Sequence, residues 1–332
     1  MCKVTIALSV YNVAEYVRAS LDCILAQTFK DFELLCIDDA STDGTWEILQ
    51  EYAAKDGRIR LLRQEKNQGL SVSRNLAIQN AKGEYLLMLD GDDLFAHDIV
   101  EKAYNKAKET NADMVMWDYT VFYQEADLDK KRNEVSGLIN VSSKDKLTLL
   151  RRPAFVWVRL LKMNAVRSLG IYFTPGLTKQ DIPIHWKLII SLDRISLIPE
   201  RLSFYRQQEN STSNRKGRSV YSLAYVMDIV GQQLKEDGIY GIYKDEFLRS
   251  RLSLLQGMYD HVNPELKAEA LSMVKERLGE DEWAYVNNPD NDLSSRVRNF
   301  YGMLKGNRWA GFKYKGIHCI RFVYRMFKKS EL

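Results

Sequence analysis

Short apolar runs alternate with helical patterns through residues 1–120. Runs such as KVTIALSV, FELLCID and EYLLMLD are apolar along most of their length, and the stretches between them carry apolar residues at helical spacing. Strands that are apolar on both faces need helices on both sides of their sheet, which favours parallel pairing. The alternation therefore predicts an α/β fold with a mostly parallel, Rossmann-like sheet flanked by helices.

The same pattern assigns elements along the whole chain. It predicts strands at 3–10, 32–38, 59–65, 84–90, 112–119 and 194–206, and helices at 14–28, 45–56, 70–83, 97–110 and after Asp181. We expect Asp43 to cap the second helix and Gly83 to close the third. Residues 121–150 lack strong periodicity, and from residue 217 onward the pattern is mostly helical. Two regions follow from this, residues 1–215 and a helical region at 216–332.

Bulk properties exclude several classes of protein. No apolar run approaches the roughly 20 residues that a membrane-spanning helix needs. The N-terminal MCKVTIALSVYN is expected to form a first strand rather than a signal peptide. The four cysteines show no CxxC spacing, which favours reduced thiols over a disulfide framework or a zinc site; they are Cys2, Cys23, Cys36 and Cys319. We therefore expect a cytoplasmic protein.

Acidic and polar side chains stand where the predicted strands end. LDGDD places three carboxylates directly after an apolar run, and a tight turn alone explains an Asp-Gly pair. However, ligands in open α/β sheets bind beyond the carboxyl ends of the strands, and several polar residues share that position: Ser9, Asp38, Asp39, Asp90 and Asp92. Hard oxygen ligands of this kind suit Mn2+ or Mg2+ held together with the oxygens of a diphosphate. The spacing does not fit a calcium-binding EF-hand loop.

Three further stretches carry candidate site residues, and for two of them helix capping is an alternative explanation. In NQGLSVSRN the serines can cap a helix, but Arg74 and Asn75 can also face the crevice. Asp181 in TKQDIPIHW can be a helix cap, or it can face the same crevice from the opposite side. Asp38 can accept a hydrogen bond from a base or a ribose.

Several enzyme classes lack their motifs here. The four histidines are scattered and there is no HExxH, so a histidine-based metal site is not expected. There is no GxGxxG after the first strand and no GxxxxGK[ST], which argues against a dinucleotide-binding dehydrogenase and a P-loop NTPase.

Several motifs occurring together resemble the family 2 glycosyltransferases, which have the GT-A fold. The matching stretches are IALSVYNVAEYVRASLDCILAQTFKDFELLCIDDASTDGT and NQGLSVSRNLAIQNAKGEYLLMLDGDD, followed by FVWVRLLK, QDIPIHWKLI and LSFYRQQENSTS. The resemblance implies a nucleotide-binding half at 1–120 and an acceptor-binding half at 121–215. It also implies a sugar transfer from a nucleotide-sugar donor, most simply a UDP-linked one.

The resemblance assigns roles residue by residue. It implies that Tyr11 stacks on the base with Ser9 alongside, that Asp38 holds the base, and that Arg74 borders the nucleotide. In the DxD motif Asp92 is the direct metal ligand, and Asp90 binds ribose or metal. Asp181 is the general base. The chain departs from the family pattern at Gln180, where a glutamate is usual, and at Ser9, where a proline is usual.

These roles agree with the chemistry of an inverting, metal-dependent transferase. A Mn2+ or Mg2+ ion neutralises charge on the departing diphosphate, and a carboxylate on the opposite face takes the proton of an acceptor hydroxyl. We expect the acceptor to be a glycan or a lipid-linked sugar in surface polysaccharide or glycolipid synthesis. Two alternatives stay open: a nucleotidyltransferase, although SVYNVAEY lacks the basic glycine-rich loop that such an enzyme needs, and a catalytically inactive transferase-like binding subunit.

The C-terminal stretch is strongly basic. Residues 301–332 contain eight lysines and arginines but one acid, Glu331. Residues 305–329 interleave these cations with aromatic side chains, which fits either a helix packed on its own domain or peripheral docking on an anionic membrane at the inner face. The acidic remainder of the chain argues against nucleic acid as a partner, and homo-oligomer formation stays open.

Overall fold

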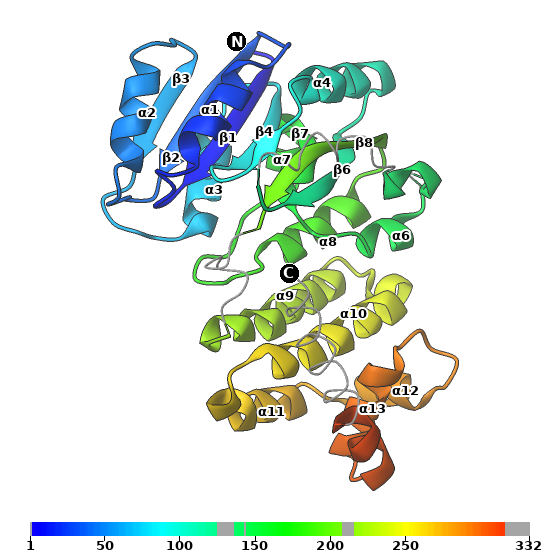
Figure 1. The fold of residues 1–332 in the computed structure, drawn as a ribbon. Coiled ribbons are helices and arrows are strands. Elements are labelled where there is room, and N and C mark those ends of the chain that lie inside the picture. The colour runs from blue at the N-terminus through cyan, green and yellow to red at the C-terminus, as the bar shows by residue number, and fades with distance from the viewer. Residues whose placement is uncertain (1, 125–135, 143, 208–215, 316–332) are drawn as a thin grey trace. The chain divides into compact units, whose positions relative to one another are not determined.

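The computed structural model in Figure 1 describes residues 2–124, 136–142, 144–207 and 216–315. The chain divides into two compact units, residues 1–214 and 215–332. The first unit is a mixed α/β sheet with helices on its faces, and the second is helical. The α/β fold class predicted from the sequence is confirmed.

One eight-stranded sheet forms the centre of the first unit, in the order β3-β2-β1-β4-β7-β6-β8-β5. Its strands are β1 Val4–Val10, β2 Phe32–Asp38, β3 Ile59–Arg63, β4 Tyr85–Asp90, β5 Leu94–Phe95, β6 Met114–Phe122, β7 Arg159–Lys162 and β8 Ile195–Arg206. The first four strands pair in parallel, as the alternation of strands and helices predicts. Their carboxyl ends therefore meet at one edge of the sheet.

The remaining strands depart from a purely parallel sheet. Strand β7 is inserted antiparallel between β4 and β6, so that Leu160 pairs with Leu87 on one side and with Val115 on the other. Strand β8 pairs in parallel with β6. The four-residue strand β7 lies within FVWVRLLK, a run too short for periodicity to assign as strand or helix.

Helices cover the sheet and connect its strands. They are α1 Val17–Leu25, α2 Thr45–Ala53, α3 Leu70–Asn80, α4 Ile99–Thr110, α6 Lys146–Leu150, α7 Met163–Ser168 and α8 Asp181–Ser191, with short 3-10 turns η2 Gly137–Asn140 and η3 Val156–Val158. Helix α8 begins at Asp181, as the sequence predicts.

Two predicted helix ends need correction. The residue before α2 is Gly44, in a left-handed conformation with φ 93°, and Asp43 stands one position outside it. The Asp43 carboxylate still accepts the backbone N–H of Thr45 at 3.1 Å. Helix α3 ends at Asn80, so Gly83 does not close it. Gly83 is needed for close approach instead, because a Cβ there would lie 2.4 Å from the backbone nitrogen of Thr5.

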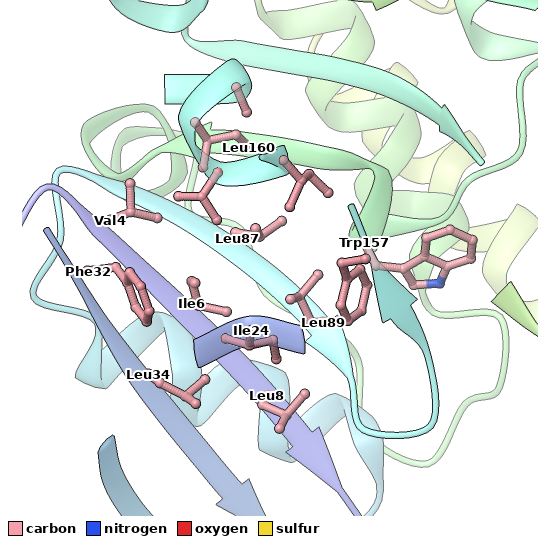
Figure 2. Close-up of a cluster of buried hydrophobic side chains, with 14 of the residues drawn as sticks. Val4, Ile6, Leu8, Ile24, Phe32, Leu34, Leu87, Leu89, Trp157 and Leu160 are labelled. Atoms are coloured by element: carbon pink, nitrogen blue, oxygen red, sulfur yellow. The ribbon is translucent and has the colours of Figure 1, made fainter. Parts of the chain in front are cut away.

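The core of the first unit packs around β1 and β4 (Figure 2). Ten of its side chains, each at most 4% exposed, are Val4, Ile6, Leu8, Ile24, Phe32, Leu34, Leu87, Leu89, Trp157 and Leu160. Burying an aliphatic or aromatic side chain of this size contributes about 1.5–3 kcal/mol. This packing fixes the parallel strands relative to one another and so fixes the polar residues at their ends.

The second unit consists of helices. They are α9 Ser222–Glu236, α10 Tyr240–His261, α11 Lys267–Glu276, α12 Glu280–Asn287 and α13 Ser295–Leu304, with 3-10 turns η5 Arg218–Tyr221 and η6 Pro264–Leu266, and residues 308–315 form a last helix. Within the described ranges, none of the helices is long and apolar enough to cross a membrane.

Candidate active site

The parallel register places three of the predicted site residues within one residue of the same level. Ser9 pairs with Asp90 across β1 and β4, and the next residue, Val10, pairs with Asp38 across β1 and β2. Ser9 and Asp38 are buried, whereas Tyr11, just beyond β1, is 46% exposed. An exposed aromatic ring next to buried polar groups at a strand edge can stack on a planar ligand.

Arg74 joins two acids that come from distant parts of the chain, Asp90 and Asp181. It stands on α3 with its side chain buried, and its Nη2 donates to the Asp90 carboxylate at 3.1 and 3.3 Å. Its Nη1 donates to the carboxylate of Asp181. Since Asp90 ends β4 and Asp181 begins α8, one guanidinium connects both sides of the candidate site.

The surroundings of Asp181 act on its pKa in opposing directions. Burial raises its pKa, while the positive charges of Arg74 and Arg159 act in the opposite direction. Its place in the first turn of α8 also favours the anion, because helix N-termini carry partial positive charge.

Gln180 completes the coordination of Arg74. In the amide orientation that satisfies its surroundings, Gln180 Oε1 accepts from Arg74 Nη1 at 3.1 Å and its nitrogen donates to the Leu177 carbonyl at 3.1 Å. A glutamine in this place supplies an acceptor without a further negative charge. The departure from the family pattern therefore leaves Asp90 and Asp181 as the two anions that contact Arg74.

Each residue of the SRN stretch, Ser73 to Asn75, has a different structural role. Ser73 Oγ accepts from Gln64 Nε2 at 3.0 Å, which ties α3 to the end of β3. The amide of Asn75 exchanges two hydrogen bonds of 2.8 Å with the backbone of Phe173. This clamp fixes the loop that leads to Asp181, so α3 positions both Arg74 and one of its partners.

The acids of the LDGDD segment lie in different surroundings. Gly91 lies against β1, where a Cβ would be 2.5 Å from Val10 Cγ1. Asp92 is half-buried, and burial together with the charge of Asp90 raises its pKa to about 6. A nearby cation would relieve this electrostatic cost at Asp92.

Asp93 is a structural residue. It is 1% exposed, and its Oδ1 accepts the backbone N–H of Arg206 at 2.8 Å. Arg206 Nε donates to the Asp92 carbonyl at 2.8 Å, and its guanidinium lies between the rings of Tyr16 and Phe122. Burial raises the pKa of Asp93, with repulsion from Asp92 as a second cause. These contacts tie the acidic segment to the end of β8.

The IDD stretch organises the loops at the same edge. Both Asp38 oxygens accept the backbone N–H of Ser41 at 3.2 Å, and Asp38 pairs with Arg63 Nε at 3.2 Å. Asp39 accepts from Gln64 Nε2 at 2.6 Å and from the backbone N–H of Gly69 at 2.8 Å. The two acids hold the loops after β2 and before α3.

Strained backbone flanks these side chains. Among the described residues, Asn12, Ala40 and Lys179 are non-glycine residues with φ of 52°, 61° and 60°. Such conformations persist where the surrounding structure fixes them, and they cluster at functional sites.

A buried arginine–histidine pair influences Asp181, because the positive charge of Arg159 acts to lower the pKa of that carboxyl. Arg159 is fully buried, its Nη2 donates to His185 Nδ1 at 3.2 Å, and its Nε donates to the Phe155 carbonyl at 3.1 Å. His185 Nε2 lies 3.3 Å from the Leu150 carbonyl, so the neutral ring donates from Nε2 and accepts at Nδ1. Burial and Arg159 lower the pKa of His185 to about 3.

The acids fit a divalent cation that shares its coordination with a ligand. Within the described part of the chain, no group of three or more histidine, cysteine or acidic residues forms a complete metal cage. Mg2+ and Mn2+ are commonly held by one or two carboxylates together with phosphate oxygens. Asp90 and Asp92, with Asp92 at a raised pKa, are a donor set of this kind.

Most of these site residues were predicted from the sequence, but the residues that hold them in position were not. The register brings Ser9 and Asp90 level with each other and Asp38 one residue further along, and hydrogen bonds join Arg74, Asp90 and Asp181. Sequence reasoning missed the tasks of Asp39, Phe173, Arg159 and Arg206. Asp39 carried a signal in its place beside Asp38 at a strand end, and Arg159 and Arg206 lie in the matching stretches FVWVRLLK and LSFYRQQENSTS. The contacts of Phe173, Arg159 and Arg206 depend on tertiary structure that these stretches do not reveal.

Comparison with known proteins gives a consistent result. Residues 5–166 match the family model described as glycosyl transferase family 2. Glycosyltransferase GlyA of Streptococcus pneumoniae is 30% identical over 222 residues, which are 64% of this chain and 31% of GlyA. Glycosyltransferase GlyG of the same organism is 26% identical over 238 residues, 68% of this chain and 77% of GlyG. The matched stretch thus spans under a third of one relative and about three quarters of the other.

The fold also has a solved counterpart. The crystal structure of S. aureus TarS residues 1–349 superimposes with a TM-score of 0.64 at 20% identity, covering 92% of this chain and 88% of that chain. TarS has also been solved in complex with UDP-GlcNAc and with UDP. At this level of identity the likeness shows the shared GT-A fold.

Proposed function

Because residues 5–166 belong to glycosyl transferase family 2, we propose that this protein moves a sugar from a UDP-linked donor to a hydroxyl of a glycan or lipid-linked acceptor. The observation that carries the proposal is the bridge from Asp90 through Arg74 to Asp181. It joins the donor-side acid at the end of β4 to a carboxylate that begins α8. A transferase that attacks from the face opposite the leaving group needs charged groups on both sides of the reacting carbon.

The donor half of the proposal uses the ends of β1, β2 and β4. Tyr11 would stack on the base, with Ser9 beside it, and Asp38 and Asp90 would bind the base and ribose. The complexes of TarS with UDP-GlcNAc and with UDP support a uridine nucleotide on this fold. Arg74 lies beside Asp90, where its charge can also attract the anionic donor.

Asp92, with Asp90, would hold Mn2+ or Mg2+. When bound, the cation neutralises charge that grows on the departing diphosphate. The raised pKa of Asp92 means that its carboxylate is partly protonated below pH 6, so donor affinity should fall in that range.

Asp181 would act as the general base. It accepts the proton of the acceptor hydroxyl as that oxygen attacks the anomeric carbon, and the bond to the diphosphate breaks on the opposite side. The product then has the inverted anomeric configuration. The charge of Arg74 favours the ionised form of Asp181, while burial raises the pKa of Asp181 and so makes its carboxylate a stronger base than an exposed one.

A donor screen tests the proposal. Purified protein is mixed with Mn2+ and with UDP-, GDP- and dTDP-sugars in turn, and the thermal midpoint and donor hydrolysis are measured. We expect a UDP-sugar to raise the midpoint and to be hydrolysed slowly, and proton NMR to show inversion at the sugar. Retention of configuration would contradict the role of Asp181, and stabilisation without hydrolysis or transfer would favour the inactive binding subunit.

We propose that the transferred sugar enters a surface polysaccharide or a glycolipid, in keeping with an acceptor whose hydroxyl approaches Asp181. Release of pyrophosphate from a sugar phosphate and a nucleoside triphosphate would instead indicate a nucleotidyltransferase.

A further inference from the structure

The last described helix, residues 308–315, is fixed to the second unit by one face. Ala310 and Tyr314 are 8% and 5% exposed. The Tyr314 hydroxyl donates to Asp260, and its ring lies 5.3 Å from that of Phe300. The helix is therefore held in place without help from its other face.

The opposite face presents two large aromatic side chains to solvent. Trp309 is 73% exposed and Phe312 is 72% exposed, and their ring centroids are 6.2 Å apart in an edge-to-face arrangement. Single exposed apolar residues are common on protein surfaces, but two adjacent aromatic rings left uncovered form a patch, and patches often mark an interaction site.

Basic residues lie next to the two rings along the chain, and one of them, Lys305, also donates to Asn287 Oδ1 at 2.9 Å. Between residues 305 and 315 there are four cations and no acid: Lys305, Arg308, Lys313 and Lys315. In the ranges that the structure describes, none of the four forms an ion pair with an acid. We call residues 305–315, with the outward side chains of Trp309 and Phe312, the basic aromatic face.

We propose that the basic aromatic face docks on an anionic lipid surface, with Trp309 and Phe312 in the interfacial layer and the four cations at the level of the headgroups. Aromatic rings favour the membrane–water interface, and each lysine or arginine near an anionic leaflet contributes about 1 kcal/mol. The sequence beyond residue 315 continues the pattern with four further lysines and arginines and one acid.

Charge distinguishes a lipid surface from other partners. A second copy of this chain would bring the same cations against the first, and like charges in contact are unfavourable. A uniformly anionic bilayer matches all of the cations at once and also accepts the rings. The inference does not depend on the proposed enzymatic function, because vesicle binding needs neither donor nor acceptor.

Vesicle flotation with the full chain tests the proposal. We expect the protein to float with vesicles of phosphatidylcholine mixed with phosphatidylglycerol, to remain below with vesicles of phosphatidylcholine alone, and to lose binding as salt is raised. The double variant Trp309→Ala/Phe312→Ala should bind at least about tenfold more weakly. The pair Arg308→Gln/Lys313→Gln should weaken binding by about thirtyfold, and only to anionic vesicles.

A matched control separates this face from general exposure. Ile242 on α10 is 74% exposed in the same unit, and Ile242→Ala should float like the unchanged protein. Equal thermal midpoints for all variants show that folding is unchanged. No flotation with anionic vesicles, or equal flotation of the Trp309→Ala/Phe312→Ala variant, overturns the proposal. A dimer or an oligonucleotide complex that depends on these residues while vesicles are not bound also overturns it.

Discussion

At the scale of the residue, Arg74 couples the two sides of the candidate site. Its planar guanidinium contacts Asp90 with one nitrogen and Asp181 with the other. A lysine carries the same charge on a single nitrogen and cannot reproduce this fork. The geometry of Arg74, and not its charge alone, is what the site requires.

Arg74→Met should destabilise the fold as well as abolish transfer. Removing one partner of a buried ion pair costs about 3–5 kcal/mol because the remaining charge is left uncompensated. Urea unfolding measures this loss. Arg74→Lys should recover part of the stability but little of the transfer rate, and full recovery of transfer by lysine would contradict the bridging role.

His185 gives the protein a pH-dependent stability. Its pKa is about 3 in the folded protein, against an ordinary value of 6.5. Between these values the unfolded state binds the additional proton, so the free energy of unfolding falls as the pH drops below 6.5. The slope from this one group approaches about 1.4 kcal/mol per pH unit.

The prediction is checked by urea unfolding at pH 7.5 and pH 5.5. His185→Gln should lose less stability between the two pH values than the unchanged protein, because glutamine does not titrate. His261 is exposed, and His261→Gln should keep the full pH dependence. An identical pH dependence in His185→Gln would show that the histidine does not cause it.

At the scale of the element, the junction of β4 with the acidic segment depends on Gly91. A methyl group there would lie 2.5 Å from Val10 Cγ1 on β1. Overpacking of this kind typically costs about 1–3 kcal/mol. Gly91→Ala should therefore lower the free energy of unfolding and weaken Mn2+-dependent UDP binding.

Two comparisons make the Gly91 prediction specific. Gly91→Ala should lower the free energy of unfolding less when Val10 is also changed to alanine than when Val10 is kept, because Val10→Ala removes the clashing Cγ1 atom. Gly57 has open space around its Cβ position, so Gly57→Ala should leave UDP binding unchanged. Additive losses at Gly91 and Val10 would rule out the steric explanation.

The elements also show what sequence periodicity can and cannot predict. The four parallel strands and α8 are long or strongly patterned, and they were predictable. Strand β7 was not, because its pairing with Leu87 and Val115 is decided by residues far away in the chain. Gly83 was assigned to a helix end because closure is the common task of glycine, yet its task is close approach to β1.

The same limit applies to the site. Strand-end acids could be located from the sequence because parallel strands end at one edge. Their sharing of Arg74 could not, since Asp181 is 107 residues away from Arg74 and its place depends on tertiary contacts such as the clamp of Asn75 on Phe173. The family resemblance named Arg74 and Asp181 separately, and the structure shows them in contact.

At the scale of the whole molecule, every side chain of the candidate site lies within residues 1–214. We expect this unit, expressed alone, to unfold cooperatively in urea and to bind UDP with Mn2+. It lacks the basic aromatic face and should not float with anionic vesicles. Loss of UDP binding by a cooperatively folded 1–214 unit would mean that the second unit contributes to the donor site.

The most direct test of the central claim compares binding with transfer in Asp181→Asn. Asparagine keeps the size of the side chain but cannot take the acceptor proton. We predict that titration calorimetry shows Mn2+-dependent UDP affinity within about threefold of the unchanged protein, while the transfer rate falls at least about a hundredfold, the usual loss when a general base is removed. Transfer by Asp181→Asn at a near-normal rate would contradict the assignment of Asp181 as the base.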